Sequence, residues 1–319
     1  MNAAAAVREA HQVPERRSIK MWDGEVSCLL WEAADARAPA VHFAHANGFN
    51  ALTYRTLLDP LARDMRIAAT DLRGHGQTTL AANPKGMRSW HIYRDDIVRT
   101  LNELDGRPKL LVGHSMGATA SLMVALAKPN WVTGLVLVEP VILPPKYIRW
   151  MKIMRALGLA ERVSPLVAQA KNRRGIWPSH EAMFEAYRGR GAFRTWPEEV
   201  VRDYITGGTV DFMDDKQIRL ACTPGWEAAN YSSNAADIWR ELDALRCPLT
   251  LIVGGKRSTC PDPVVELLIA RRPEIRVVKV PAASHFLPME YPEIVRREVR
   301  GMAGNRKTEN GVQGSESPL

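Results

Sequence analysis

The chain has 319 residues, of which 46% are hydrophobic and 24% are charged, a composition typical of a globular protein with a sizeable core. Its formal net charge at pH 7 is +8, and no nucleic-acid-binding motif accompanies this basic excess. No run approaches the roughly 18 apolar residues that a membrane-spanning helix needs. We therefore expect neither a nucleic acid partner nor a transmembrane segment.

The cysteines and the N-terminal residues indicate which metal sites and which cellular location to expect. The four cysteines are scattered, with no C-x-x-C pair, which indicates neither a zinc site nor a disulfide framework: Cys28, Cys222, Cys247 and Cys260. Residues Met1 to Pro14 lack the apolar stretch of a secretory signal, so a cytoplasmic location is predicted. We expect no metal and no cofactor.

Short apolar runs alternate with longer amphipathic patterns along most of the chain. Strands are predicted at Val41–Ala44, Arg66–Thr70, Lys109–Val112, Leu135–Val138, Thr250–Val253 and Arg276–Val280. Helical patterns cover Tyr54–Arg63, Trp90–Glu103 and Pro263–Arg271. This alternation predicts an α/β fold whose sheet is mostly parallel and doubly wound.

The alternation lapses between about residues 141 and 240, a stretch rich in Arg, Trp and Pro. We interpret residues 141–240 as an inserted, mainly helical cap, and residues 1–140 and 241–302 as the core. Residues 303–319 are polar and are expected to be a disordered tail. Within the cap, the basic segment from Lys146 to Arg174 is either a solvated helix face or a surface that attracts an anionic substrate tail or a membrane.

One pentapeptide, Gly113 to Gly117 (G-H-S-M-G), lies between a predicted strand and a helix-compatible segment. A serine on such a turn is a nucleophile elbow, in which a strained backbone exposes the hydroxyl and leaves no room for side chains at the two glycines. The N-terminus of the following helix favours negative charge developing beside it. Ser115 is therefore the predicted nucleophile, whereas the adjacent His114 is interpreted as packing.

Four motifs in order carry a resemblance to a known family: the His45–Phe49 segment, Asp71–Gly76 (D-L-R-G-H-G), the elbow, and Ser284–Pro292 (S-H-F-L-P-M-E-Y-P). The chain resembles α/β-hydrolases of the group that includes epoxide hydrolases, haloalkane dehalogenases and many small esterases. The resemblance implies an α/β-hydrolase fold. It also implies that His285, after the last predicted strand, is the base that takes the proton of Ser115.

The sequence departs from the family at the residue expected to be the catalytic acid, which would pair with His285. Many relatives carry Asp where this chain has Ser258. Glu139, directly after the strand that follows the elbow helix, is the preferred candidate, because some relatives place their acid at that strand end. Asp262 is the alternative acid, and a site without an acid stays open.

The resemblance also implies an oxyanion hole of two backbone N–H groups. One belongs to Met116, the residue after the nucleophile, and the second to Asn47 in the loop after an earlier strand. Ala46 replaces the family's usual glycine, and Gly48 could shift the second donor to Phe49.

Together these features predict a serine hydrolase that cleaves carboxylic esters through an acyl-enzyme. The cap aromatic residues indicate an apolar acyl or alcohol group. A thioesterase, a lactonase, a C–C bond hydrolase and an acyltransferase stay open, as does a ligand-binding receptor on the same fold. The expected partner is a small ester or thioester, and a homodimer is left open.

Overall fold

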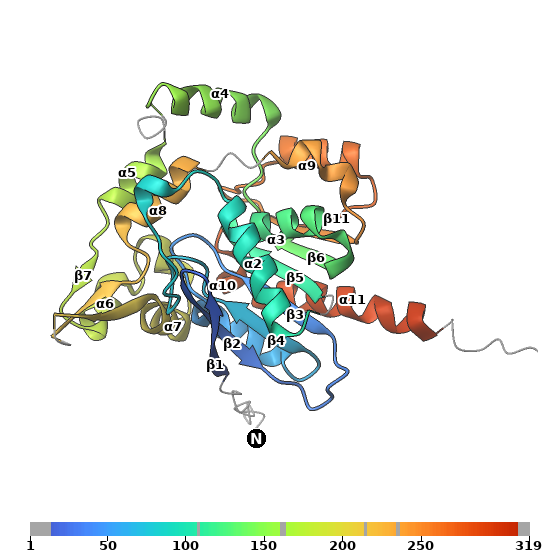
Figure 1. The fold of residues 1–319 in the computed structure, drawn as a ribbon, viewed down its shortest axis with the longest axis horizontal. Helices are drawn as coiled ribbons and strands as arrows, with labels where there is room; N and C mark the ends of the chain where they lie inside the picture. The colour runs from blue at the N-terminus through green and yellow to red at the C-terminus, as the bar shows by residue number, and fades with distance from the viewer. Residues whose placement is uncertain (1–13, 107–108, 160–163, 214–215, 234–236, 312–319) are drawn as a thin grey trace, which may run out of the picture.

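The computed structural model describes residues 14–106, 109–159, 164–213, 216–233 and 237–311. Its centre is an eight-stranded sheet with the strand order β1-β2-β4-β3-β5-β6-β10-β11 (Figure 1). The strands are β1 (Glu15–Met21), β2 (Gly24–Trp31), β3 (Ala40–Ala44), β4 (Arg66–Thr70), β5 (Lys109–His114), β6 (Val132–Val138), β10 (Leu249–Gly254) and β11 (Arg276–Val280). From β4 to β11 all neighbouring strands are parallel, whereas β1–β2 and β2–β4 are antiparallel.

The predicted fold class is confirmed, and all six predicted strands exist with ends shifted by at most three residues. The antiparallel β1–β2 hairpin was not predicted. The strand order reverses at β3, which lies between β4 and β5. In open α/β sheets, such a reversal opens a crevice at the carboxyl ends of the strands, where ligands bind.

Helices cover both faces of the sheet. One hydrophobic core joins the sheet to α2 (His91–Leu104), α3 (Met116–Ala127) and α9 (Asp262–Arg271). The opposite core joins it to α1 (Arg55–Leu58) and α11 (Pro292–Gly311). Alternate residues of β5 enter opposite cores, Leu111 the first and Leu110 the second, as the period of a strand requires.

Two expectations, one of a helix and one of a disordered tail, differ from the structure. The segment expected as one helix over Tyr54–Arg63 is divided into two 3₁₀ turns, Ala51–Tyr54 and Asp59–Leu61, flanking α1. Pro60 explains the interruption, because a proline lacks the N–H that a helix interior needs. At the other end, α11 continues to Gly311, although disorder was expected from residue 303; once a helix is packed, each further residue adds one hydrogen bond. Residues 312–319 of the expected tail and residues 1–13 lie outside the described residues.

The segment between β6 and β10 contains five α-helices, three short 3₁₀ helices and a small sheet in the part that the structure describes. The α-helices are α4 (Pro145–Ala156), α5 (Pro165–Lys171), α6 (His180–Tyr187), α7 (Glu198–Gly208) and α8 (Pro224–Ser233). The three-stranded antiparallel sheet has the order β7-β9-β8, formed by Ile176–Trp177, Gln217–Leu220 and Thr209–Phe212. This sheet was not expected in a segment interpreted as mainly helical.

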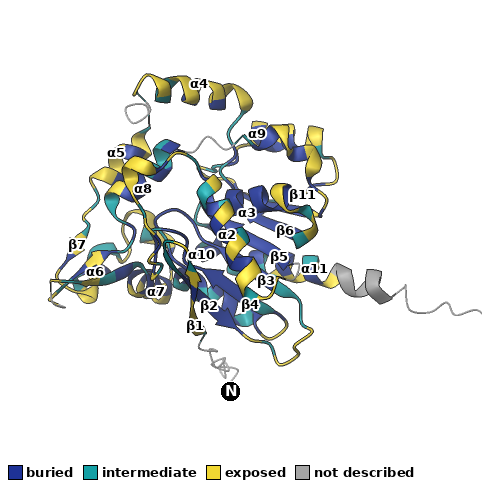
Figure 2. Ribbon diagram, viewed as in Figure 1, coloured by how far each residue is buried: buried dark blue, intermediate teal, exposed yellow. Residues whose placement is uncertain are grey.

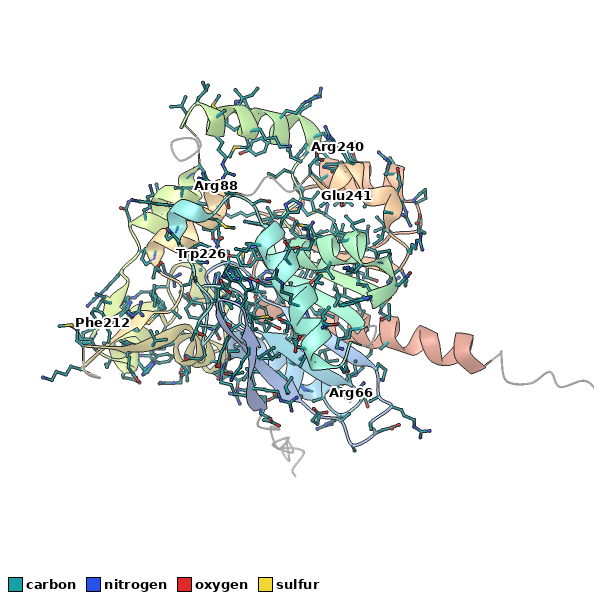
Figure 3. The ribbon with its side chains drawn as sticks, viewed as in Figure 1. Arg66, Arg88, Phe212, Trp226, Arg240 and Glu241 are labelled. Atoms are coloured by element: carbon teal, nitrogen blue, oxygen red, sulfur yellow. The ribbon has the colours of Figure 1, made fainter. Side chains whose placement is uncertain are left out.

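The cap, as we call residues 141–240, lies against the carboxyl ends of the central strands. Trp226 of α8 lies at this junction (Figure 3). Its indole N–H donates to the carbonyl oxygen of Arg73 at 3.0 Å. Chain entry into the cap is fixed by Thr119 of α3, whose hydroxyl donates to the carbonyl oxygen of Val141 at 3.1 Å and accepts its N–H at 3.0 Å. Among the described residues, no helix combines the length and the apolar character needed to cross a bilayer.

Candidate active site

Ser115 stands at the carboxyl end of β5 in a strained backbone conformation. Its φ is 54° and its ψ is −117°, between the end of β5 and the first residue of α3. A Cβ on Gly113 would lie 2.6 Å from the backbone of Ala118, and one on Gly117 would lie 2.2 Å from the carbonyl oxygen of Ala44. The two glycines therefore permit the close approach of strand, turn and helix that the pentapeptide predicts.

His285 links Ser115 to Glu139. Its Nε2 lies 3.1 Å from Ser115 Oγ, and its Nδ1 lies 3.2 Å from Glu139 Oε2. His285 follows β11 in a loop held by Glu290, whose carboxylate accepts the N–H and the hydroxyl of Ser284 at 2.7 and 2.8 Å. The structure thus brings together three of the predicted site residues from three separate strand ends.

Glu139 is fully buried at the end of β6, with a φ of 50°. Its Oε1 accepts the N–H of Gly254 at 2.6 Å and the hydroxyl of Ser258 at 2.8 Å, and its Oε2 accepts the N–H of Thr259 at 2.9 Å. Burial by itself raises the pKa of this carboxyl. The hydrogen bonds from His285 and Gly254 outweigh it, so the pKa lies below its usual value.

The alternative acid, Asp262, lies elsewhere. It is the first residue of α9, its side chain is exposed, and both of its carboxylate oxygens accept from Lys279 Nζ at 2.7 Å. At Ser258, the position where the family resemblance implies Asp, the hydroxyl donates to the carboxylate of Glu139. The structure therefore assembles Glu139, and not Asp262, with His285.

Thr259 was not singled out by the sequence. Its hydroxyl donates to the carbonyl oxygen of Glu139 at 2.7 Å and lies 3.3 Å from His285 Nδ1. Thr259 therefore contacts both partners of the histidine–carboxylate pair. The only signal for it in the sequence is its position beside Ser258, in the polar run after β10.

The loop after β3 lies beside the elbow helix, and most of its backbone N–H groups near the elbow have acceptors. The N–H groups of Ala46, Gly48 and Phe49 donate to Tyr54 Oη, His75 Nε2 and the carbonyl oxygen of Ala46, respectively. Among the hydrogen bonds of the described residues, the backbone N–H of Asn47 and that of Met116 have no acceptor. These are the two donors that the resemblance assigns to the oxyanion hole, and Phe49, the alternative, is already occupied.

The side chain of Asn47 is held by the cap. Its amide nitrogen donates to the carbonyl oxygen of Glu227 at 3.1 Å, and its amide oxygen accepts from Asn230 Nδ2 at 2.8 Å. Both partners belong to α8. From α7, the hydroxyl of Tyr204 donates to the carbonyl oxygen of Gly48 at 3.1 Å. Two cap helices thus fix the loop that carries the candidate second donor.

His114 has more than a packing role. It is fully buried, its Nδ1 lies 2.7 Å from Tyr54 Oη, and its Nε2 lies 2.8 Å from the carbonyl oxygen of His285. Since a carbonyl can only accept, Nε2 carries the proton and Nδ1 accepts from Tyr54. Tyr54 also accepts the N–H of Ala46. One chain of hydrogen bonds therefore joins the loop after β3 to the backbone of His285.

Aromatic rings from the cap and the core adjoin the site. The rings of His285 and Phe286 are 5.7 Å apart, those of Phe286 and Phe49 6.2 Å, and those of Phe49 and the cap residue Trp196 5.4 Å. Phe49, Trp196 and Phe286 thus form an aromatic wall beside His285.

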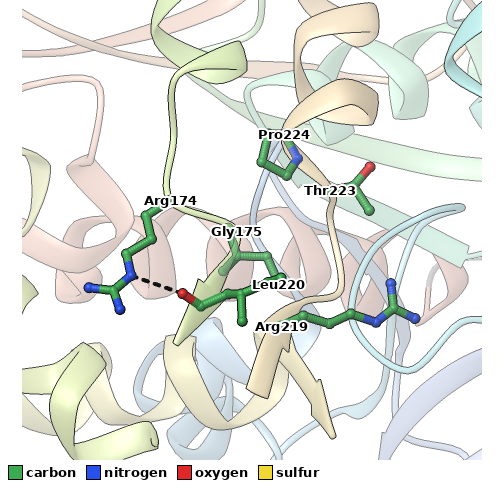
Figure 4. Close-up of a pocket in the computed structure, with 7 residues that line it drawn as sticks. Arg174, Gly175, Arg219, Leu220, Thr223 and Pro224 are labelled. Carbon is green, nitrogen blue, oxygen red and sulfur yellow. Dashed lines mark hydrogen bonds between the residues drawn. The ribbon is translucent and has the colours of Figure 1, made fainter. Parts of the chain in front are cut away.

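A separate pocket of about 420 Å³ lies at the small sheet (Figure 4). It is lined by Arg174, Gly175, Ile176, Arg219, Leu220, Thr223 and Pro224. None of the predicted site residues lines it, so it is not the site described above. Within the described ranges, no group of three or more His, Cys, Asp or Glu side chains is arranged to hold a metal ion.

Comparison with known proteins agrees with this architecture. Residues 43–298 match the model of the Alpha/beta hydrolase family, and the chain belongs to that family. It is 26% identical to the esterase Rv0045c of Mycobacterium tuberculosis, over 89% of this chain and 88% of that protein. It is 25% identical to the 2-(acetamidomethylene)succinate hydrolase of Mesorhizobium japonicum, over 94% and 98%.

Solved structures share the fold at lower identity. A crystal structure of E-2-(acetamidomethylene)succinate hydrolase superposes with a TM-score of 0.71 at 20% identity, covering 91% of this chain and 98% of that one. The thioesterase domain from the curacin biosynthetic pathway superposes with a TM-score of 0.70 at 19% identity, over 91% and 100%.

Proposed function

We propose that this protein is a serine hydrolase that cleaves carboxylic esters through an acyl-enzyme, with Ser115, His285 and Glu139 as its catalytic triad. The observation that carries the proposal is the continuous contact from Ser115 Oγ through both ring nitrogens of His285 to Glu139. Relatives named as an esterase, a lipase and a hydrolase support it.

In the first half-reaction, His285 Nε2 takes the hydroxyl proton as Ser115 Oγ attacks the ester carbonyl carbon. The negative charge on the carbonyl oxygen is held by the N–H groups of Met116 and Asn47, and the N-terminus of α3 favours the same charge. Collapse breaks the bond to the alcohol oxygen, which leaves with the proton from His285. Glu139 stabilises the imidazolium and fixes its tautomer.

In the second half-reaction, His285 takes a proton from water, and the resulting nucleophile attacks the acyl carbon bound to Ser115. Release of the acid returns the proton to Ser115. No step requires a cofactor. The aromatic wall of Phe49, Trp196 and Phe286 favours an apolar acyl or alcohol group. The cytoplasmic location stays a prediction from the sequence, and the homodimer stays open.

The test is covalent labelling. A fluorophosphonate should add once to the wild-type protein, at Ser115, as seen by intact mass and peptide mapping. Ser115→Ala should abolish both the adduct and ester turnover, whereas the exposed Ser18→Ala should retain both. An adduct that maps to any other residue contradicts the assignment of the nucleophile.

Substrate class is decided by a screen of p-nitrophenyl esters of graded acyl length beside acyl-CoA thioesters. With an apolar wall in the site, the rate should rise with acyl length and fall once the pocket is filled. Faster turnover of thioesters would make the protein a thioesterase. Binding of esters without turnover would favour a receptor on the same fold.

A further inference from the structure

The outer face of α4 combines apolar and basic side chains. Figure 1 shows α4 at the outer edge of the cap, and Figure 2 shows its outward face as exposed. Trp150, Ile153 and Leu157 are 39%, 56% and 62% exposed. Large apolar side chains exposed together in this way mark an interaction surface. We call this face the α4 surface; it consists of Lys146, Tyr147, Arg149, Trp150, Lys152, Ile153 and Leu157.

The orientation of α4 is fixed by its opposite face. Ile148 and Met151 are buried, and the guanidinium of Arg155 donates to the carbonyl oxygens of Met87 and Arg88 in the core. Trp150, Ile153 and Leu157 follow one another at spacings of three and four residues, which place them in one row along the helix. The apolar row therefore faces outward because the rest of the helix is anchored.

Uncompensated cations flank this row. Lys146, Arg149 and Lys152 are exposed, and α4 contains no acidic residue. Within the described part of the chain, none of these three has an ion-pair partner. By contrast, Arg188, directly after α6, and Arg202 on α7 each pair with a glutamate. The positive charge of α4 is therefore available to an anionic partner.

We propose that the α4 surface docks the protein on an anionic lipid membrane. A helix of this kind lies in the plane of the interface, with its apolar side chains at the boundary of headgroups and acyl chains and its cations on lipid phosphates. Tyr147 and Trp150, whose rings are 5.2 Å apart, are of the type that settles at headgroup level. Because these apolar residues form a single convex row, they fit a planar membrane better than they would fit the cleft of a partner protein.

Docking does not depend on the proposed catalysis, because the face lies on the outside of the cap and contains no triad residue. A hydrolase placed on a membrane meets apolar esters at high local concentration. Vesicle binding and ester turnover are measured separately, so failure of one proposal is distinguishable from failure of the other.

The experiment is co-sedimentation of the full chain with vesicles of phosphatidylcholine containing 30% phosphatidylglycerol, and with phosphatidylcholine vesicles alone. We expect binding to the anionic vesicles, weakened by 0.5 M salt, because screening shortens the reach of the charges. Trp150→Ser/Ile153→Ser/Leu157→Ser should lower partitioning by about tenfold or more. Lys146→Gln/Arg149→Gln/Lys152→Gln should lower it by about as much, on the anionic vesicles only.

Matched controls separate the α4 surface from general properties of the protein. Trp22→Ser removes the most exposed tryptophan, and Arg190→Gln/Arg194→Gln/Lys216→Gln removes the same net charge elsewhere; both should bind as the wild type does. Circular dichroism and hydrolysis of a water-soluble ester establish that the α4 variants are folded. The proposal is overturned if the wild type does not sediment with anionic vesicles, or if the α4 and control variants lose binding equally.

Discussion

Glu139 accepts four hydrogen bonds, from Gly254, Ser258, Thr259 and His285, and no water-exposed surface remains on it. A buried carboxylate is costly unless its oxygens are paired. Here the pairing comes from the end of β10, which lies next to β6 in the sheet. The donors that satisfy the charge also fix the direction in which it faces His285.

Replacing this carboxylate should abolish most of the activity without unfolding the protein. Glu139→Gln is expected to lower kcat by roughly 10³- to 10⁴-fold, because an amide neither stabilises the imidazolium nor holds the required tautomer. The measurement is the steady-state rate on a p-nitrophenyl ester. Asp262→Asn is the control and should be nearly silent, since Asp262 is paired with Lys279 on the surface. If instead Asp262→Asn alone is inactive, the acid is misassigned.

Tyr54 provides a second test at this scale. Tyr54→Phe leaves the N–H of Ala46 and Nδ1 of His114 without partners in a buried environment, which should cost about 1–3 kcal/mol of unfolding free energy. Since the chain of bonds positions the loop after β3 and the backbone of His285, kcat should fall while KM changes little. Urea unfolding and steady-state kinetics measure both effects.

Tyr147→Phe, on the exposed face of α4, serves as the comparison, because it removes a hydroxyl that lies at the surface. If Tyr54→Phe lowers stability but leaves kcat unchanged, the hydrogen-bond chain is structural and does not position the site.

At the scale of elements, the loop after β3 forms hydrogen bonds with both the cap and the core. α8 binds the side chain of Asn47, and α7 binds the carbonyl oxygen of Gly48. The same loop also contacts the core, where Gly48 donates to His75. The position of the candidate oxyanion donor therefore depends on cap helices that are distant in the sequence.

Asn230→Asp tests this dependence. The change keeps an acceptor for the Tyr93 hydroxyl but removes the donor to Asn47 and places a carboxylate against an amide oxygen. We expect kcat to fall by about 10- to 100-fold, somewhat less than for outright loss of an oxyanion donor, with little change in KM. Ser232→Ala on the same helix is the control. A rise in KM alone would mean that α8 acts on substrate binding and not on the donor.

The parallel strands, the elbow and the preference for Glu139 could be predicted because each depends on a short local pattern or on a motif. The proposed acid, Glu139, was inferred from Ser258 at a position where the family resemblance implies Asp, together with one carboxylate at a strand end. Tyr54, His114 and Thr259 could not be predicted, because their contacts join residues 26 to 171 positions apart. A short stretch of sequence does not indicate which strand ends lie next to one another in the fold.

At the scale of the whole molecule, four histidines of the described residues are completely buried: His42, His45, His75 and His114. Burial lowers the pKa of His45 to about 4 and that of His42 and His75 to about 3, and it lowers the pKa of His114 as well. These rings are neutral in the folded protein. In the unfolded chain they take up protons near pH 6.5.

The folded state should therefore lose stability on acidification. Below pH 6.5 the unfolded chain binds protons that the folded one excludes, so the unfolding free energy falls as pH falls, until the folded pKa values are reached. His42, His45 and His75 each contribute about 1.4 kcal/mol of loss by pH 5.5, or about 4 kcal/mol together, and His114 acts in the same direction. Urea unfolding at pH 8 and pH 5.5 measures this loss. An unfolding free energy that is equal at the two pH values contradicts it.

The two hydrogen bonds between Thr119 and Val141 affect whether the cap of this enzyme can be exchanged for another. The cap begins two residues after Glu139, so a shift of the cap would pull directly on the acid if nothing held the chain between them. Thr119 binds both the N–H and the carbonyl oxygen of Val141, which ties this junction to the elbow helix. A cap grafted from a relative would thus leave the acid in register, whereas Asn47 would lose its supports on α8. We therefore expect such chimeras to lose activity because Asn47, the candidate oxyanion donor, is misplaced. Restoring the two contacts from α8 to Asn47 should recover activity.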